Sequence, residues 1–514
     1  MSKTIIIIGA GLAGLSAALQ AAENGCNVKL VSSLPSERAQ SVMAEGGINA
    51  ALNTKDENDS PEEHFTDTIK AACGLADQNA VWGMTQAAPE LVHWLLKLGV
   101  KFNMSGYDDV DLRNFGGQKK KRTAFAQSDT GKQIMTAMID AVRRKEASGM
   151  VERFSNHSFL TLRLCGNICC GCVIRDEYSQ ETVELPGDAV IVATGGMHGL
   201  FGNTTGSLSN TGEVTAELFR LGVPLANGEM IQYHPTTVKC GGKRMLISEA
   251  ARGEGGRLFA MKDGKQWYFM EEKYPELGNL MPRDITAREI WKVSHESEVF
   301  LDMTEISEEI ISNKLSGLAD DCMTYLHKDI RKEPVSVLPG IHYFMGGILV
   351  DEQHRTPIQN LYAAGECCAQ YHGANRLGGN SLLGALYGGR VAAKSACEQA
   401  DVVDLSCATQ IDFPPASQIS EIKQLNKVMQ ETMGVVRNEN TLLNGIKTVQ
   451  ALTGNLPLLG MAVLKSALAR KESRGAHWRE DYPKSNDDDY LKTTVARFDG
   501  KQIQISFVPV PERR

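Results

Sequence analysis

Three observations along the 514-residue sequence predict an α/β fold that ends in a helical region. The first is an apolar strand, a glycine-rich loop, an alanine-rich helix and a second apolar strand, all within residues 3–31. The second is a pair of later apolar strands, in 189–196 and 361–366, that end in glycine. The third is helical periodicity of apolar residues within 415–475. Strands that alternate with helices favour a parallel sheet with helices on its faces.

The first strand, loop and helix are typical of a dinucleotide-binding turn. The loop G-A-G-L-A-G contains Gly9, Ala10, Gly11, Ala13 and Gly14. Gly9 suits a tight turn, Gly11 lets a pyrophosphate approach the backbone, and Gly14 lets the helix pack on the strand. Because a strand precedes this loop and a helix and second strand follow it, the sequence predicts a Rossmann-like dinucleotide site.

The second strand ends in Ser32 and Ser33, where an acidic residue commonly binds the ribose of NAD. This counts against a plain NAD-dependent enzyme. Further glycine sites follow at A-E-G-G (44–47), at T-G-G (194–196) and at G-E (365–366). Glycine backbone can lie close to a flat ring. With the first loop, these sites resemble the FAD-binding half of flavoproteins, in which distant segments close on the isoalloxazine.

Residues 371–390 place Arg376 in a glycine-rich loop before a helix that begins near Ser381. A helix N-terminus attracts anions, and a fixed guanidinium can bind a carboxylate with two hydrogen bonds. We therefore expect two anionic partners here, one a cofactor phosphate or flavin oxygen and the other a substrate carboxylate.

The composition excludes some classes of protein. The net charge is −8 and the one basic block is K-K-K-R at 119–122, which disfavours nucleic acid. No apolar run approaches the ~18 residues of a transmembrane helix, so we expect a soluble, unexported chain without a transmembrane segment. The cysteines in 165–172 match no metal-ligand spacing, and their segment alternates like a β-hairpin, so we predict no metal site.

Chemically active side chains gather between residues 231 and 288: His234, Ser248, Glu249, Arg252 and Arg283. Each alone has an ordinary explanation, such as a capping serine or a solvated Arg–Glu pair. His342, in the apolar stretch 336–350, would alone be interpreted as a core histidine.

Taken together, the motifs resemble the family of flavoprotein subunits of fumarate reductase and succinate dehydrogenase, a superfamily that also contains L-aspartate oxidase. The motifs that carry the resemblance, from Gly9 to about Asp481, are A-E-G-G, F-G-G-x(4)-R-T, A-T-G-G, Q-Y-H-P-T, E-x-x-R-G-E-G-G, P-R-D, H-Y-x-M-G-G, G-E, H-G-A-N-R-L-G-x-N-S-L and E-S-R-G-A-H. The resemblance implies a Rossmann-like FAD-binding domain with an inserted α+β capping domain and a C-terminal helical domain. The implied limits are 1–227 and 341–405 for the FAD-binding domain, 228–340 for the capping domain, and 406–514 for the helical domain and a polar tail.

The same resemblance implies how a dicarboxylate would be bound. His342 and Arg376 resemble the pair that binds one carboxylate, and His234 and Ser248 resemble the pair that binds the other. Phe115 is expected beside the substrate.

The resemblance also implies a proton route. Hydride from flavin N5 would reach one alkene carbon, and Arg283 would donate a proton to its neighbour. Arginine has a pKa above about 12, so it needs resupply, and Glu249 and Arg252 resemble the relay that provides it. The implied cofactor contacts are Gly9, Ala10, Gly11, Ala13, Gly14, Ser32, Gln40, Ser41, Ala44, Glu45, Gly46, Gly47, Thr194, Gly195, Glu213, Glu366, Arg376, Ser381 and Leu382.

Two positions depart from the family pattern. Gln40 stands where relatives that attach FAD covalently have a histidine, so we predict non-covalent FAD. Without that bond the flavin is harder to reduce, which favours fumarate reduction over succinate oxidation. Glu213 replaces the aspartate of a T-G-D motif and affects one contact near the flavin.

Other functions remain open. L-aspartate oxidase also binds FAD non-covalently, but it carries glutamate where this chain has Phe115, and L-A-S-N-S where this chain has L-G-G-N-S after Arg376. A reductase of another enoate, an NAD-dependent dehydrogenase and an inactive flavin-binding scaffold are further alternatives.

The family also implies partners. We expect an iron–sulfur subunit to exchange electrons with this chain, because the sequence has no c-type haem motif. A further membrane-anchor subunit is left open, as is a self-contained reductase. We expect a cytoplasmic location, with attachment to the inner face of the membrane through partner subunits also left open.

Overall fold

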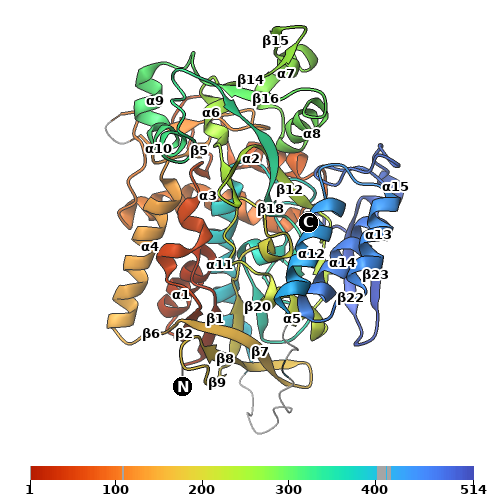
Figure 1. Ribbon diagram of the computed structural model, residues 1–514. Coiled ribbons are helices and arrows are strands. Elements are labelled where there is room, and N and C mark those ends of the chain that lie inside the picture. The colour runs from red at the N-terminus through yellow and green to blue at the C-terminus, as the bar shows by residue number, and fades with distance from the viewer. Residues whose placement is uncertain (1, 107–108, 402–412, 414–417, 514) are drawn as a thin grey trace.

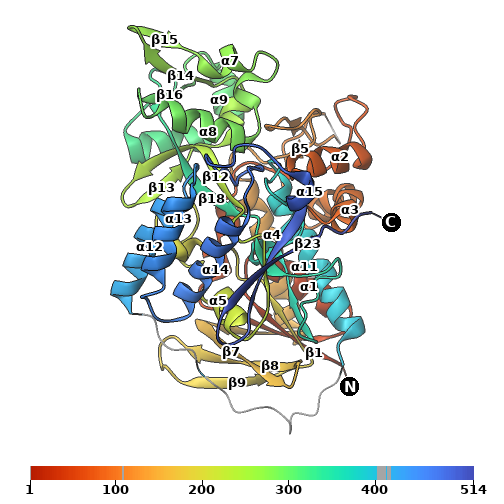
Figure 2. The ribbon, with the colours of Figure 1, turned by 90° about the vertical axis from the view of Figure 1, so that its right-hand side faces the viewer.

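The structure is a computed structural model that describes residues 2–106, 109–401, 413 and 418–513. It confirms the predicted α/β class: an α/β part, a cap region (residues 243–336) at the top of Figure 1, and C-terminal helices at its right. Figure 2 shows the cap region again above the α/β part, from the side. The predicted domain boundary between 405 and 406 lies outside the described residues, and the limits 228 and 340 remain predictions.

The central sheet of the α/β part has the order β20-β10-β1-β2-β6, and all its neighbours pair in parallel. This is the arrangement that the glycine loop and the later apolar strands predict. The strands and the helices that flank them are β1 (Thr4–Ile8), β2 (Asn27–Ser32), β6 (Val151–Ser155), β10 (Ala189–Val192), β20 (Leu361–Ala363), α1 (Leu12–Glu23), α4 (Thr130–Ala147) and α11 (Asn380–Gln399).

Alternate residues of β1 face two different cores, as the period-2 geometry of a strand requires. Ile5 and Ile7 pack with α1, α4 and α11, whereas Ile6 and Ile8 pack against a second sheet that covers the opposite face. That sheet is β7 (His157–Cys165), β8 (Ile168–Asp176) and β9 (Thr182–Pro186). The hairpin predicted around the cysteine cluster is therefore confirmed as β7 and β8.

The cap region covers one end of the central sheet. Its own four-stranded sheet has the order β15-β14-β16-β17, and a three-stranded sheet, β13-β12-β18, connects it to the α/β part. These elements are β12 (Ile231–Cys240), β13 (Lys243–Leu246), β14 (Arg257–Lys262), β15 (Lys265–Trp267), β16 (Val299–Asp302), β17 (Val335–Ser336), β18 (Leu338–Phe344), α6 (Glu249–Gly253), α7 (Phe269–Lys273), α8 (Arg283–Val293), α9 (Glu308–Lys314) and α10 (Ser316–Asp321).

The C-terminal part is helical as predicted, but the polar tail expected at its end is a β-hairpin. Its two strands complete the sheet β21-β19-β11-β22-β23. The sequence pattern concealed them, because β22 carries mostly polar residues and buries its middle through pairing with β11. The bounds are α5 (Glu213–Arg220), β11 (Leu225–Ala226), β19 (Gly347–Leu349), β21 (Cys368–Ala369), α12 (Ile419–Thr432), α13 (Glu439–Val449), α14 (Asn455–Ala469), β22 (Lys492–Phe498) and β23 (Ile503–Pro509).

A short helix, α15 (Asp487–Tyr490), precedes β22. Further elements complete the wall around the cap side of the α/β part. They are α2 (Pro61–Ala71), α3 (Gln78–Lys97), and a small sheet of β3 (Ile48–Asn49), β4 (Leu112–Arg113) and β5 (Thr123–Ala124). Among the residues described, none of the helices combines the length and the apolar character needed to cross a lipid bilayer.

Candidate functional site

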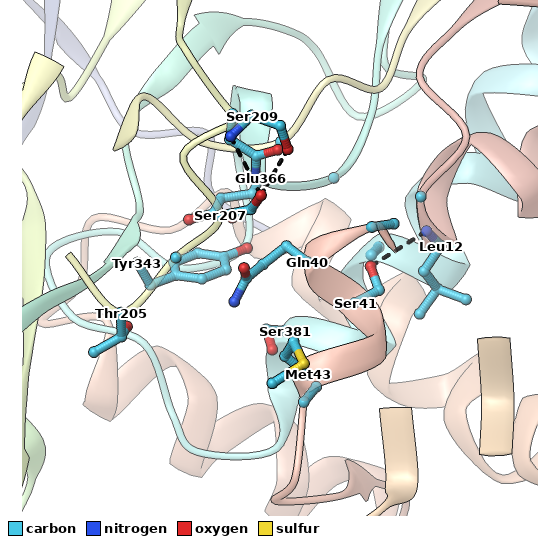
Figure 3. Close-up of a pocket in the computed structure, with 18 of the residues that line it drawn as sticks. Leu12, Gln40, Ser41, Met43, Thr205, Ser207, Ser209, Tyr343, Glu366 and Ser381 are labelled. Atoms are coloured by element: carbon cyan, nitrogen blue, oxygen red, sulfur yellow. Dashed lines mark hydrogen bonds between the residues drawn. The ribbon is translucent and has the colours of Figure 1, made fainter. Parts of the chain in front are cut away.

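A cavity of about 820 Å³ lies between the carboxyl ends of the central strands and the cap region. Figure 3 shows part of its wall. The cavity brings together nearly all the residues selected from the sequence, although they come from distant segments. The predicted residues that line it are Gly9, Ala10, Gly11, Ala13, Ser32, Gln40, Ser41, Ala44, Glu45, Gly46, Gly47, Phe115, Thr194, Gly195, Glu213, His234, Ser248, Glu249, Arg283, His342, Glu366, Arg376, Ser381 and Leu382.

Two predicted residues, Gly14 and Arg252, lie behind the wall. A Cβ on Gly14 would come within 1.8 Å of the Gly9 carbonyl oxygen, so this glycine serves the packing of α1 on the glycine loop. This is the packing role that the motif assigns to it, and its contact with the cofactor remains a prediction.

The turn before α1 forms one cradle of the cavity. Gly9 has φ of +111°, and a Cβ there would come within 2.2 Å of the Ala193 carbonyl oxygen. At the start of α1, the Leu12 N–H donates to Ser41 Oγ at 3.3 Å, a bond drawn in Figure 3. The open backbone and the positive end of the helix suit a pyrophosphate.

A second cradle is formed by the A-E-G-G segment. A Cβ on Gly47 would lie 2.5 Å from the Ala124 carbonyl oxygen, and one on Gly46 would lie 2.9 Å from the Phe115 ring. This backbone therefore lies close against the small sheet and offers a side-chain-free surface to the cavity, as a planar ring requires.

Glu45, in the same segment, is half-buried because it faces the cavity, and within the described part of the chain its Oε2 has no hydrogen-bond partner. Burial, with Asp321 nearby, raises the pKa of Glu45 to about 8. This carboxyl is therefore neutral at neutral pH.

The far wall carries Glu366, whose Oε1 accepts a hydrogen bond from the Phe344 N–H at 3.0 Å. The same oxygen lies 3.7 Å from Nε2 of His198. Ser381 lies in the first turn of α11 and lines the cavity, so the positive end of this helix adjoins the cavity. These surfaces, with the two glycine cradles, fit an extended dinucleotide with a flat ring.

A hydrogen-bonded Arg–Glu–Arg cluster lies where the cap region meets the cavity. Arg283 donates from Nε and Nη2 to Oε2 of Glu249, at 2.9 and 2.7 Å. Arg252 donates from Nη2 to Oε1 of the same carboxylate at 3.2 Å. Burial opposes the charge on Glu249, but the Arg283 and Arg252 guanidiniums outweigh it and hold the pKa of this carboxyl below its usual value.

Arg376 is a buried residue of the same cavity, with Cζ 4.2 Å from the centroid of the Tyr343 ring and with no partner for Nε among the residues that the structure describes. Burial, and then the Arg283 charge, lower the pKa of Arg376 to about 9. Both effects disfavour the charged form of Arg376, and an anion bound beside the guanidinium would stabilise that form.

His234 and His342 lie side by side, with ring centroids 5.1 Å apart. Burial, followed by the Arg283 charge, holds the pKa of each well below 6.5. The shorter of the two backbone contacts of His234 Nδ1 with Thr236 is to the carbonyl, at 3.0 Å. The Thr236 carbonyl requires a proton on Nδ1, whereas the Thr236 N–H requires a bare Nδ1, so the two contacts correspond to different tautomers. Nε2 has no hydrogen-bond partner among the residues that the structure describes.

Three further residues belong to this site but were not selected from the sequence. Gln232 accepts from Arg283 Nη1 at 3.1 Å and donates from Nε2 to the Arg376 carbonyl at 2.9 Å, so it links the two arginines. Tyr343 carries Arg376 on its face, and Thr205 Oγ1 lies 2.7 Å from His342 Nδ1. Gln232 and Tyr343 stand inside the Q-Y-H-P-T and H-Y-x-M-G-G motifs, which was the one available signal.

Comparisons with known proteins agree with this geometry. A family model described as an FAD binding domain matches residues 4–382, and one described as a fumarate reductase flavoprotein C-terminal domain matches residues 452–513. The succinate dehydrogenase flavoprotein subunit of Bacillus subtilis (strain 168) is 38% identical over 100% of this chain and 98% of its own length.

Two further relatives match over nearly their whole length. The 8-methylmenaquinol:fumarate reductase flavoprotein subunit of Wolinella succinogenes is 32% identical over 100% of this chain and 92% of its own. Among solved structures, a mutant FrdA chain of E. coli quinol fumarate reductase superposes with a TM-score of 0.90 at 27% identity, covering 100% of this chain and 97% of that one.

Proposed function

This chain belongs to the family of flavoprotein subunits of succinate dehydrogenase and fumarate reductase, and we propose that it interconverts fumarate and succinate, with fumarate reduction as the favoured direction. It is an FAD-dependent oxidoreductase. The observation that carries the proposal is the position of Arg283, which faces the cavity opposite Arg376 while bonded to Glu249.

FAD fits the two glycine cradles, because Gly9, Gly46 and Gly47 all line the cavity without a side chain, and Gly9 and Gly47 have φ of +111° and +137°, which favour glycine. When bound, it supplies the two electrons of the reaction as a hydride from N5. Gln40 lines the cavity at the position where covalent relatives carry histidine, and a carboxamide forms no such bond, so the cofactor is held non-covalently.

The dicarboxylate lies between two sets of donors. Arg376 and His342 bind one carboxylate, and the unpartnered Nε of Arg376 supports this assignment. His234 and Ser248 bind the other, supported by the unpartnered Nε2 of His234. Together these groups fix the alkene and stabilise the charge that builds on a carboxylate as hydride arrives.

Arg283 donates the proton to the second alkene carbon. Its Nε and Nη2 are bonded to Glu249, and Nη1 is bonded to Gln232, so the guanidinium is oriented before substrate arrives. Glu249 returns a proton to Arg283, and Arg252 resupplies Glu249 from behind.

The direction rests on Gln40. Relatives of both names match the chain, so their names do not decide it. A flavin without the covalent bond is harder to reduce, and reduced flavin then gives electrons to fumarate more readily than oxidised flavin takes them from succinate.

Oxidation of L-aspartate is the second candidate, because the superfamily contains that oxidase. The substrate ammonium would need a carboxylate partner. Phe115 provides none, and Glu45 is neutral below a pKa of about 8. Both observations favour the dicarboxylate.

The deciding experiment compares three substrates on the purified yellow protein. A reduced viologen dye with fumarate, and a dye acceptor with succinate, should both give turnover, with fumarate reduction the faster. Rapid aspartate oxidation that produces hydrogen peroxide would overturn the assignment.

We assign the exchange of electrons to an iron–sulfur partner subunit, with a membrane-anchor subunit as a further candidate. The names of the relatives support this, since each is called a subunit and one acts with a menaquinol. The proposed location is the cytoplasm, next to the membrane that holds the quinol. Co-purification under mild detergent, followed by an ultraviolet–visible spectrum, tests for the iron–sulfur partner.

A further inference from the structure

Helix α8 of the cap region begins with Arg283, and five residues later it carries Arg288, which contacts the C-terminal part. Arg288 Nη1 donates to the Gly475 carbonyl oxygen at 3.2 Å, and its Cζ lies 4.3 Å from the centroid of the Trp478 ring. The same Nη1 lies 3.2 Å from Asp284 Oδ2. With 13% of its side chain exposed, Arg288 is a largely buried bridge between two parts of the molecule.

A second path connects the start of α8 to the loop that carries Arg376. Asp284 Oδ1 accepts from Asn375 Nδ2 at 3.1 Å. Asn375 Oδ1 in turn accepts from Gln232 Nε2 at 2.9 Å, and Gln232 Oε1 accepts from Arg283 Nη1. The hydrogen bonds thus form a circuit that leaves α8 at Asp284 and returns to it at Arg283.

The segment on which Arg288 rests is itself fixed to the same loop. The Ala476 N–H donates to the Ala374 carbonyl at 2.9 Å. Gly475 has φ of +54°, and a Cβ there would lie 2.6 Å from that carbonyl oxygen, so the two segments are in close contact. Arg288 therefore connects α8 to a base that also holds the loop before Arg376.

We infer that Arg288 is a positioning residue, which latches α8 onto Gly475 and Trp478 and so sets the separation of Arg283 from Arg376 across the cavity. The inference rests on the proposed function, in which Arg283 is the proton donor. The planar guanidinium matters, because it stacks on the indole and donates to a carbonyl at the same time. Without it, α8 keeps its hydrogen bonds from Arg283 to Gln232 and from Asn375 to Asp284, but it loses its attachment to the segment 475–478, and the start of α8 opens away from that segment more often.

The test uses Arg288→Gln, Trp478→Leu and the double variant, with full-length protein and bound FAD. Displacing a catalytic group by about 1 Å costs up to ~100-fold in rate, so each single variant should lower kcat for fumarate by about 10- to 100-fold. KM should change less than kcat, and the flavin absorbance should be retained. The double variant should be no slower than the slower single variant, because each substitution breaks the same contact, that between Arg288 and Trp478.

Arg257→Gln is the matched control. Arg257 also lies in the cap region, with Cζ 3.7 Å from the centroid of the Tyr268 ring and an ion pair to Glu271 at 2.7 Å, but its partners are all within the cap region. Its kcat should equal that of the wild type. A comparable loss in Arg257→Gln would mean that any weakened cap slows the enzyme, and would overturn the inference.

Hydrogen–deuterium exchange of residues 283–293 provides a readout that does not depend on activity. Exchange there should be faster in Arg288→Gln and Trp478→Leu than in the wild type or in Arg257→Gln. Unchanged exchange overturns the latch, and faster exchange with unchanged kcat overturns its positioning role. If the wild type turns over neither fumarate nor succinate, the proposed function fails, and exchange alone decides whether the latch holds α8.

Discussion

Arg283 donates two hydrogen bonds to a single oxygen of Glu249, Oε2, at 2.9 and 2.7 Å. The other oxygen of that carboxylate binds Arg252. One carboxylate thus lies between two guanidiniums, and its negative charge offsets part of the cost of burying two positive charges.

Arg283→Ala should abolish turnover while FAD stays bound. The substitution removes the proposed proton donor, and Arg283 lies at the cap side of the cavity, away from the glycine turn before α1. Steady-state kinetics with fumarate measure the loss of turnover, and the flavin spectrum after gel filtration measures whether FAD stays bound. If fumarate reduction persists, another group donates the proton.

Dicarboxylate affinity should fall as pH rises. Burial holds the pKa of His234 well below 6.5, and a bound carboxylate would raise it, so binding takes up a proton. The contribution is complete below the free-state pKa and is lost as pH rises through the bound-state pKa. Titration with succinate, followed by flavin difference spectra, measures this.

The pH dependence should be weaker in His234→Gln and unchanged in His93→Gln, since His93 lies exposed on α3. Equal pH dependence in wild type and His234→Gln would assign the proton to another group.

The flavin midpoint potential of Glu45→Gln should differ from that of the wild type only at alkaline pH. The pKa of Glu45 is about 8, so below it the wild type already carries a neutral side chain there. Above it, a negative charge beside the cofactor site makes the flavin harder to reduce. Spectroelectrochemical titration from about pH 6 to 9 should show a steeper fall in the wild-type midpoint potential. Parallel curves would mean that Glu45 does not ionise in this range.

Arg122→Met should be strongly destabilising. Arg122 is fully buried between Asp59, at 2.9 Å, and Asp67, at 3.0 Å. Its removal leaves two buried carboxylates, at an expected cost of about 3–5 kcal/mol in the free energy of unfolding.

Arg143→Met is the control for that substitution, because Arg143 is exposed and pairs with Glu37 at the surface. Its loss should cost less than about 1 kcal/mol. Denaturant unfolding of both variants measures the difference, and similar losses would contradict the assigned role of burial.

Acid precipitation should release FAD into the supernatant. Gln40 lacks the imidazole nitrogen through which covalent relatives hold the cofactor, so the bond cannot form there. Absorbance of the supernatant, compared with that of the pellet, measures this. A yellow pellet would show that another residue attaches the flavin.

The sequence predicted β1, β2, β10 and β20 of the central sheet, because all four are short apolar runs and glycine closely follows β1, β10 and β20. It did not predict β6, whose sequence V-E-R-F-S is largely polar. It also predicted the members of the cavity, since Arg283, His342 and Arg376 each stand in a specific motif. Such motifs identify a residue, but they do not predict which groups its side chain contacts.

The C-terminal hairpin and the role of Gln232 were not predicted for physical reasons. Strand β22 is stabilised by pairing with β11, more than 200 residues away along the chain, and local pattern carries no trace of that. Gln232 is an uncharged side chain, and its importance lies in joining Arg283 to Arg376, two residues that only the fold brings together.

In sequence, the first strand of the central sheet is Thr4–Ile8 and the last is Leu361–Ala363. The segment 475–478, which contacts α8, comes more than 100 residues after the last strand. During synthesis, the glycine turn before α1 therefore leaves the ribosome long before its opposite wall exists. Contacts between such distant segments form slowly, and the apolar strands stay exposed in the meantime. The complete cavity, and with it the full set of cofactor contacts, therefore exists only once nearly the whole chain has been made.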